Sequence, residues 1–357
     1  MSDSPTAGSA EMLQYIRALP DQLAASGDLP GLDGFQPLTQ TVRQIVLCGM
    51  GGSAIAGDLA RPLCENAGLP LWSQRDYGLP NWVQDDTLVV VSSYSGGTAE
   101  TLSALTAAQR RGCPLFALTS GGELRERAQR PVGTGFPAVI LPGGLPPRAS
   151  LGFGLGALLH GLSRRLNKPD LRADIPDALS VLREGNELYD PGDSAATQPV
   201  DNPAAAVATD CLHRFLVIYS ASPESHGPGG RLRAQVNENA KSPAGSYQFP
   251  ELDHNDIMGW DLSPAQREYF GLLLLRSQDE DPRNSQRVSV TVDLLASEFA
   301  VVNAVHARGA TSLGRIMSLV QFGDYLSWYL ARERGVDPMP VHRIDLLKQQ
   351  LQKGSEV

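Results

Sequence analysis

The sequence has few cysteines and fewer basic than acidic residues. Its four cysteines, Cys48, Cys64, Cys113 and Cys211, stand far apart and form no C-x-x-C pair, which argues against a zinc site and a disulfide framework. With 30 Lys and Arg against 39 Asp and Glu, the formal net charge is −9, so the phosphate backbone of a nucleic acid would be repelled. We expect reduced cysteines, a cytoplasmic location and no nucleic-acid partner.

Long hydrophobic runs are also missing. The first six residues lack the basic start and apolar stretch of a signal peptide, and no apolar run approaches the roughly 20 residues that span a bilayer. We therefore expect no membrane partner. What the sequence does contain is 42% hydrophobic residues and 36 glycines in a chain of 357, which is typical of a globular α/β protein with room for two domains.

Short apolar runs alternate with helical patterns through the first half of the chain. Apolar residues at helical spacing predict an N-terminal helix at 11–25. Strands that alternate with helices indicate βαβ units, and hence a parallel sheet covered on both faces. The predicted strands are 45–48, 88–91, 115–118 and 138–141, and the further helices are 53–64, 98–111, 150–166 and 175–188.

The pattern restarts after a stretch rich in Pro, Gly and Asp at 190–199, which indicates a linker. Residues 1–189 are thus predicted to form one α/β domain, 190–200 the linker, and 201–357 a second α/β domain of similar plan. Its predicted strands are 215–219, 269–275, 288–292 and 300–305, and its predicted helices are 231–240, 315–333 and 343–351.

Two Ser/Gly-rich segments each follow a predicted strand. Gly49-Met-Gly-Gly-Ser53 comes after 45–48, and Ser92-Ser-Tyr-Ser-Gly-Gly-Thr98 comes after 88–91. A turn of this kind points backbone N–H groups, hydroxyls and a helix N-terminus at one spot, which suits a phosphate dianion. Either loop alone is weak evidence, because glycines at strand ends often only make a tight turn. On neighbouring strands of a doubly wound sheet the two would converge.

Both loops carry candidate phosphate ligands. Ser53 and Thr98 fall at predicted helix starts, and Ser93 and Ser95 lie within the second turn. With the backbone of Gly52, these residues form the predicted phosphate site.

The order of these motifs resembles a known family. GMGGSAIAGD at 49–58, SSYSGGTAET at 92–101 and Pro-Pro-Arg at 146–148 are similar to the sugar isomerase (SIS) domain. More narrowly, the chain resembles the bifunctional phosphoglucose/phosphomannose isomerases, which carry two such domains in tandem. One departure is Gly97, where such loops more often carry Asn. The resemblance also takes in the segments 237–241, 251–256, 323–330 and 344–348.

The resemblance implies both a fold and a reaction. Each half is expected to be a SIS-type, flavodoxin-like domain, with a parallel β-sheet flanked by helices in three layers. The expected enzyme is a metal-independent aldose–ketose isomerase without a cofactor. It would interconvert glucose 6-phosphate, mannose 6-phosphate or both with fructose 6-phosphate through an enediol(ate), because proton removal from C2 of either aldose gives the same intermediate. Dual specificity rests on the resemblance alone.

By resemblance, Glu238 is the base that moves a proton between C1 and C2, and Arg148 is the cation beside O1 and O2. Periodicity alone leaves Glu238 off the buried face of its helix, where a carboxylate is usually just solvated. Arg148 follows two prolines that stiffen its approach, although an exposed loop arginine is an equally good interpretation of the pattern.

The resemblance assigns His254 and Lys348 to ring opening. In this family the equivalent histidine reaches the pocket from the partner subunit, so a homodimer is expected; by itself, a lone histidine in a polar loop is usually solvated. Lys348 borders a helical stripe formed by Ile344, Leu347 and Leu351, which predicts an ammonium turned half inward or a snorkelling lysine.

Other functions stay open at this point. An isomerase of narrower phosphosugar range, or the isomerase half of an amidotransferase, would share these motifs, but the latter needs a glutamine-hydrolysing domain for which residues 1–40 are too few. A non-catalytic sugar-phosphate sensor would keep the phosphate loops without needing Glu238, His254, Lys348 and Arg148 together.

Overall fold

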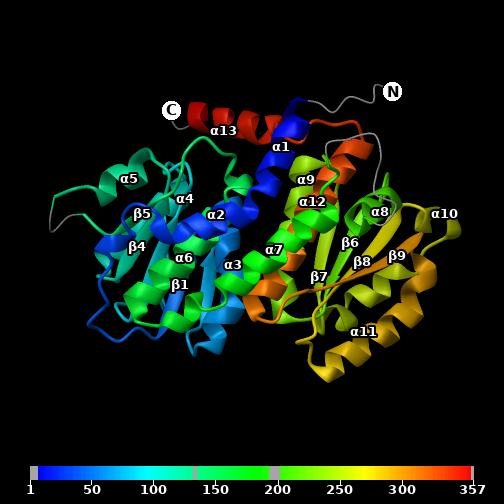
Figure 1. Cartoon of the computed structure of the whole chain (residues 1–357), viewed down its shortest axis with the longest axis horizontal. Coiled ribbons are helices and arrows are strands. Elements are labelled where there is room, and N and C mark those ends of the chain that lie inside the picture. The colour runs from blue at the N-terminus through cyan, green and yellow to red at the C-terminus, as the bar shows by residue number, and fades with distance from the viewer. Residues whose placement is uncertain (1–6, 132–134, 193–201, 355–357) are drawn as a thin grey trace.

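Two parallel β-sheets, one in each half of the chain, organise the computed structural model (Figure 1). It describes residues 7–131, 135–192 and 202–354. The strands run in the order β2-β1-β3-β4-β5 in the first sheet and β7-β6-β8-β9 in the second, and every pair of neighbours is parallel. The strands are β1 Gln44–Cys48, β2 Leu71–Gln74, β3 Thr87–Ser92, β4 Leu115–Thr119, β5 Ala138–Ile140, β6 Phe215–Ser220, β7 Ala244–Gln248, β8 Phe270–Arg276 and β9 Val301–His306.

Helices cover both faces of the sheets, as the alternation predicts. In the first half they are α1 Ala7–Arg17, α2 Leu19–Ala25, α3 Gly51–Asn66, α4 Ala99–Arg110, α5 Gly122–Ala128, α6 Leu151–Leu166 and α7 Ile175–Tyr189. In the second half they are α8 Pro203–Asp210, α9 Pro223–Asn239, α10 Pro264–Arg267, α11 Pro282–Leu295, α12 Ser312–Glu333 and α13 His342–Gly354.

The central strands of the first sheet are apolar because both of their faces are buried. Leu47 and Val90 join a core cluster with residues of α3 and α6, whereas Val46 and Val89 join another with residues of α4. Alternate side chains of a strand point to opposite faces, so each strand serves both cores. The result is three layers, and the α/β fold with two helix-flanked parallel sheets is confirmed.

The first sheet has the flavodoxin-like order 2-1-3-4-5, in which successive strands are added on one side of β1 and then, from β3 onward, on the other side. Ligands of such sheets bind in the crevice beyond the carboxyl ends of the strands at this switch point. The two Ser/Gly loops follow these two strands, so the topology places both loops at the switch point.

One predicted strand is wrong. The segment 288–292, with its alternating valines, lies inside helix α11. Asp281 caps this helix by accepting a hydrogen bond from the Arg283 backbone N–H, Pro282 occupies its first turn, and its buried side chains Val288, Thr291 and Leu295 recur at helical spacing. Strands β2 and β7 were not predicted, since neither carries a continuous apolar run.

The predicted N-terminal helix is two helices, α1 and α2, with Pro20 in the first turn of α2. The predicted linker falls mostly on 193–201, outside the described residues. Helices α1 and α12 join the two halves. Met12 and Ile16 of α1 lie in the core of the second half, and α12 spans both cores, with Leu313 in the first and Phe322 in the second.

Two buried ion pairs fasten α9 to α12. Arg231 donates to both carboxylate oxygens of Asp324 at 2.9 and 2.8 Å, and Arg315 donates to both of Glu224 at 2.7 Å. Burial by itself raises the pKa of Glu224, but the hydrogen bonds from Arg315 and Ser277 outweigh it, so this pKa lies below its ordinary value. Because α9 ends at Asn239, these pairs fix the helix that carries Glu238.

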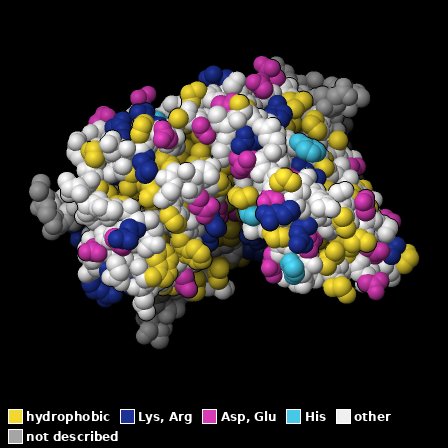
Figure 2. Space-filling model, turned by 90° about the horizontal axis from the view of Figure 1, so that it is seen from below, with side chains coloured by type: hydrophobic (Ala, Val, Ile, Leu, Met, Phe, Trp, Pro, Cys, Tyr) yellow, Lys and Arg dark blue, Asp and Glu magenta, His cyan; other side chains and the backbone are white. Residues whose placement is uncertain are grey.

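Charge is mixed on the molecular surface. Figure 2 shows acidic and basic side chains interspersed across one face, without separation into fields of one sign. Within the described ranges, none of the helices has the length and apolar character to cross a bilayer.

Candidate functional site

A hydroxyl of the first Ser/Gly loop contacts the backbone of the second. Ser53 Oγ accepts a hydrogen bond from the Tyr94 backbone N–H at 3.1 Å, which joins the first loop to the second. Within the second loop, Ser93 Oγ lies 2.9 Å from Thr98 Oγ1 and accepts from the Gly96 N–H at 3.1 Å. Ser53, Ser93 and Thr98 are therefore brought together beyond the carboxyl ends of β1 and β3, and Ser95 is exposed in the second loop.

Tyr94 ties these loops to the segment before Arg148. Its hydroxyl donates to the Pro142 carbonyl at 2.6 Å and accepts from the Leu145 N–H at 3.0 Å. A Cβ on Gly52 would lie 3.0 Å from the Arg148 backbone N, tighter than an ordinary contact, so a glycine lets α3 approach this segment. The Ser/Gly loops and the segment up to Arg148 thus pack against each other.

Gly96 and Gly97 make a matched pair for testing the loop. Gly96 has φ of +72° and a Cβ there would lie 1.8 Å from the Gly121 carbonyl oxygen, whereas a Cβ on Gly97 meets nothing within 4 Å. We expect Gly96→Ala to destabilise the protein by about 2 kcal/mol or more and to weaken phosphate binding, because the loop must move. Gly97→Ala should change stability by about 0.5 kcal/mol or less. Urea unfolding and phosphate titration measure both; equal effects would contradict the loop geometry.

Arg148 is buried, with 6% of its surface exposed, and its guanidinium is held on several sides. Nε donates to Asn239 Oδ1 at 2.9 Å, and Nη2 donates to the carbonyls of Pro338 and Met339 at 2.8 and 2.9 Å. Burial lowers the pKa of Arg148, and Arg231 adds to this effect, while Glu238 opposes it. The expectation of a rigidly held cation is met, and the exposed-loop interpretation is wrong.

Glu238 lies beside Arg148. Its Oε2 is 3.5 Å from Arg148 Nη1, and its side chain is 29% exposed. The carboxylate is thus neither free on the surface nor fully buried, which leaves one side open to a ligand. Through Arg148 and Gly52, the structure connects Glu238 of the second half with the Ser/Gly loops of the first.

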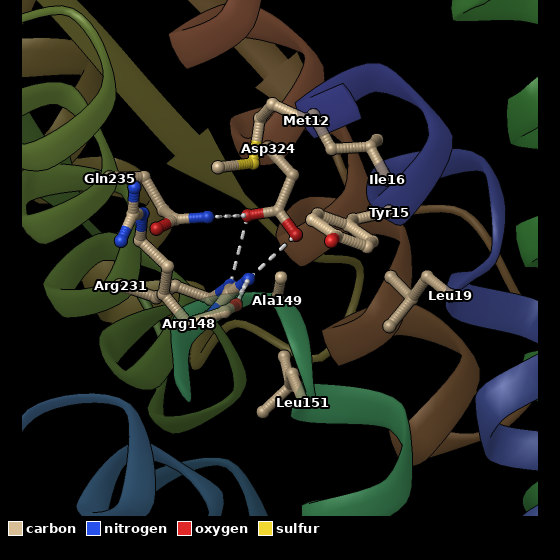
Figure 3. A pocket seen from close by; sticks show the side chains of 10 residues that line it. All are labelled: Met12, Tyr15, Ile16, Leu19, Arg148, Ala149, Leu151, Arg231, Gln235 and Asp324. Atoms are coloured by element: carbon tan, nitrogen blue, oxygen red, sulfur yellow. Dashed lines mark hydrogen bonds and ion pairs between the residues drawn. The ribbon is translucent and has the colours of Figure 1, made fainter. Parts of the chain in front are cut away.

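The polar side chains of Arg231, Gln235 and Asp324 form a hydrogen-bonded group beside Arg148 (Figure 3). Arg231 donates to the Arg148 carbonyl at 3.0 Å as well as to Asp324, and Gln235 donates to Asp324 at 2.9 Å. Apolar side chains of α1, among them Met12 and Ile16, close this region and leave a cavity of about 10 Å³, which holds a single water at most.

The structure does not bring His254 and Lys348 into this cluster. His254 ends a short 3-10 helix, Glu251–His254, and is exposed. Lys348 lies on α13, where it is exposed together with the stripe of Ile344 (40%) and Leu347 (57%). The expected half-buried ammonium is wrong for the single chain, because no described part of this chain covers that face of α13 closely enough to bury the stripe.

Sequence reasoning missed several residues that hold the site. Asn239, Arg231 and Asp324 all bind Arg148 or the residues that bind it, and Lys241 donates to the carbonyls of Glu238 and Pro340. Asp324, the one charged residue in the otherwise uncharged segment 323–330, is the signal that could have been found, because a buried carboxylate requires a partner. Within the described ranges, His, Cys, Asp and Glu form no group of three able to hold a metal ion.

Comparisons with known proteins show which family the chain resembles. The model of the bacterial phospho-glucose isomerase C-terminal SIS domain matches residues 200–351. The bifunctional phosphoglucose/phosphomannose isomerase of Caldicellulosiruptor bescii is 33% identical over 341 residues, which cover 95% of this chain and 98% of that protein. The protein of the same name from Aquifex aeolicus is 35% identical over 312 residues, which cover 87% and 90%.

A solved structure shows the same fold. A hypothetical protein of Thermus thermophilus superposes with a TM-score of 0.74 at 18% identity, covering 98% of this chain and 91% of that one. At such low identity the likeness concerns the fold alone. The extent and identity of the sequence matches go further: this chain belongs to the bifunctional phosphoglucose/phosphomannose isomerase family.

Proposed function

We propose that the protein interconverts glucose 6-phosphate and mannose 6-phosphate with fructose 6-phosphate. The observation that carries the proposal is the arrangement of Glu238 beside a buried Arg148, whose backbone packs against the Ser/Gly loops. An aldose–ketose isomerase needs a phosphate anchor, a base and a cation in one place, and these residues supply one of each.

The substrate phosphate is proposed to bind beyond the carboxyl ends of β1 and β3 in the first sheet. Ser53, Ser93, Ser95 and Thr98 offer hydroxyls, and the N-terminal turns of α3 and α4, with Gly52, offer backbone N–H groups. These donors and the positive ends of two helices favour a dianion even in a chain of net charge −9.

Glu238 is proposed to move the proton between C1 and C2 of the ring-opened sugar. Removal of the C2 proton places negative charge on the oxygens at C1 and C2, and the Arg148 guanidinium, which stays protonated, would stabilise that enediolate. The exchange requires no change of oxidation state in the protein and no metal in these steps. One base serves both aldoses because they differ only in configuration at C2.

We further propose a homodimer in which His254 of one subunit completes the site of the other, with Lys348 at the ring oxygen. Both side chains are exposed in the single chain, and so is the apolar stripe that Lys348 borders. A two-fold dimer that covers such surfaces supplies two equal sites.

The four free cysteines are all buried, which fits a reducing compartment such as the cytoplasm.

A coupled assay tests the activity. With purified protein and excess chelator, both aldose phosphates should yield fructose 6-phosphate. Turnover that needs an added metal ion, or turnover of neither sugar, would contradict the proposal.

Mixed dimers test the shared site. Subunits carrying His254→Ala and Glu238→Gln, each nearly inactive alone, should regain part of the activity when co-assembled. No recovery would place His254 outside the partner's pocket.

A further inference from the structure

Asn239, the residue after the proposed base, is fully buried at the end of α9. Its Oδ1 accepts from Arg148 Nε at 2.9 Å, and its Nδ2 donates to Ser327 Oγ at 3.0 Å. The segment 237–241 was noted in the sequence, but the proposed reaction gives this amide no role.

The orientation of the amide is fixed by its neighbours. Ser327 Oγ donates its only proton to the Asp324 carbonyl at 2.8 Å, so it must accept from Asn239. The amide nitrogen therefore faces Ser327 and the amide oxygen faces Arg148. A rotated amide would set its nitrogen against the Arg148 donor and leave the Ser327 oxygen without one.

This chain of hydrogen bonds leaves Arg148 little freedom. Nε is held by Asn239, and Nη2 is held by the carbonyls of Pro338 and Met339. Nη1 faces Glu238 at 3.5 Å, whereas a charge-assisted hydrogen bond between such groups is about 2.7–2.9 Å long. The Arg148 guanidinium is thus near the Glu238 carboxylate, and its hydrogen bonds hold it too far away for a charge-assisted hydrogen bond.

We propose that Asn239 is a positioning residue that restrains Arg148 from forming a tight ion pair with Glu238. The inference rests on the proposed function, in which Glu238 must accept a proton. A carboxylate in a close pair with a guanidinium is a weaker base, and the guanidinium is no longer free to meet the enediolate. The restraint keeps both groups available to the substrate.

Other charges face the pair and are common to every variant below. Lys241 lies at the end of α9, Arg231 lies further back on the same helix, Asp324 lies on α12, and Asp337 precedes α13. Burial lowers the pKa of Lys241, and Arg148 adds to this, while Asp337 and Glu238 oppose it. Differences between variants at position 239 therefore report on that position.

Two substitutions at this position separate positioning from mere stability. Asn239→Leu removes the acceptor and releases Nε, so Arg148 should close on Glu238; we expect the acid limb of the kcat/KM profile to move about one pH unit lower and kcat to fall about tenfold. Asn239→Asp keeps the acceptor and adds a negative charge beside Glu238, so the limb should move to higher pH. If Asn239→Leu fails to fold, Asn239→Ser replaces it.

Asn202 provides the matched control. It is also buried, at 2% exposure, and donates to the Tyr189 carbonyl and the Tyr329 hydroxyl. Neither partner belongs to the residues of the site. Asn202→Leu and Asn202→Asp should lower the melting temperature and leave the acid limb where it is. A shift of the limb in these controls, or shifts of the same sign in both Asn239 variants, would overturn the proposal.

A carbon-13 NMR titration of the glutamate carboxyls in the whole protein separates this inference from the proposed function. The Glu238 signal is identified by its loss in Glu238→Gln, and its midpoint should move in opposite directions in the two Asn239 variants. Opposite movement without any sugar turnover would overturn the function but keep the restraint. Turnover with an unmoved midpoint would overturn the restraint and keep the function.

Discussion

Glu238→Gln should reduce kcat on both aldose phosphates by about 10³-fold, within the range that a positioned general base contributes. The amide matches the carboxylate in size and can still lie beside Arg148, but it cannot accept the proton from carbon. Binding of the phosphosugar should change less than about threefold, because the Ser/Gly loops that we propose to bind the phosphate lie in the other half of the chain. Steady-state kinetics and calorimetry with a non-isomerising sugar phosphate measure the two effects.

The matched control for this prediction is Glu123→Gln. Glu123 is an exposed carboxylate on α5 that pairs with Arg127 on the surface. It should keep full activity and nearly full stability, because an exposed pair contributes little. A fully active Glu238→Gln enzyme would remove the base from the mechanism, and a variant that loses phosphosugar binding as well would point to a collapsed site instead.

Asp324→Asn should lower the free energy of unfolding by about 3–5 kcal/mol. Asp324 and Arg231 are 3% and 5% exposed, so neutralising one leaves the other as an uncompensated buried charge. The double variant Arg231→Met with Asp324→Leu should recover a large part of the loss, since it buries no unpaired charge. Urea unfolding at neutral pH measures the free energy of unfolding of the wild type and of both variants.

An exposed pair serves as the reference. Arg61 and Glu65 lie one turn apart on α3, with side chains 58% and 40% exposed, so Glu65→Gln should cost only about 0.3–0.5 kcal/mol. A comparable loss in Asp324→Asn would mean that water reaches the inner pair. Because Arg231 also donates to the Arg148 carbonyl, activity should fall in the single variant beyond the loss of folded protein.

The features that were predictable from the sequence are local. Fully buried parallel strands such as β3 and β4 read as unbroken apolar runs, and the Ser/Gly loops follow directly from the strand ends. Strand β7, Ala-Gly-Ser-Tyr-Gln, has no such run and is defined by its pairing with β6. The alternating valines of α11 satisfied the strand pattern, but the cap at Asp281 and the packing of Val288 decided for a helix.

The support of the site was not predictable because its contacts are distant in sequence. Arg148 meets Asn239 across 91 positions and Met339 across 191. Spacing along the chain carries no trace of such pairs until the fold is known. The resemblance supplied Glu238 and Arg148, and the structure explains how they are held; the roles of His254 and Lys348 stay predictions that need a second subunit.

Helix α1 packs in the core of the second half and α12 spans both cores, and this arrangement affects how the protein forms during synthesis. Trp328 of α12 donates to the Ser9 carbonyl of α1 at 2.8 Å, across 319 positions of the chain. On the ribosome, α1 emerges long before α12, which supplies part of the core around Met12 and Ile16. That part of the core stays incomplete until α12 has left the exit tunnel, and so does the part of the first core that Leu313 and Ile316 fill.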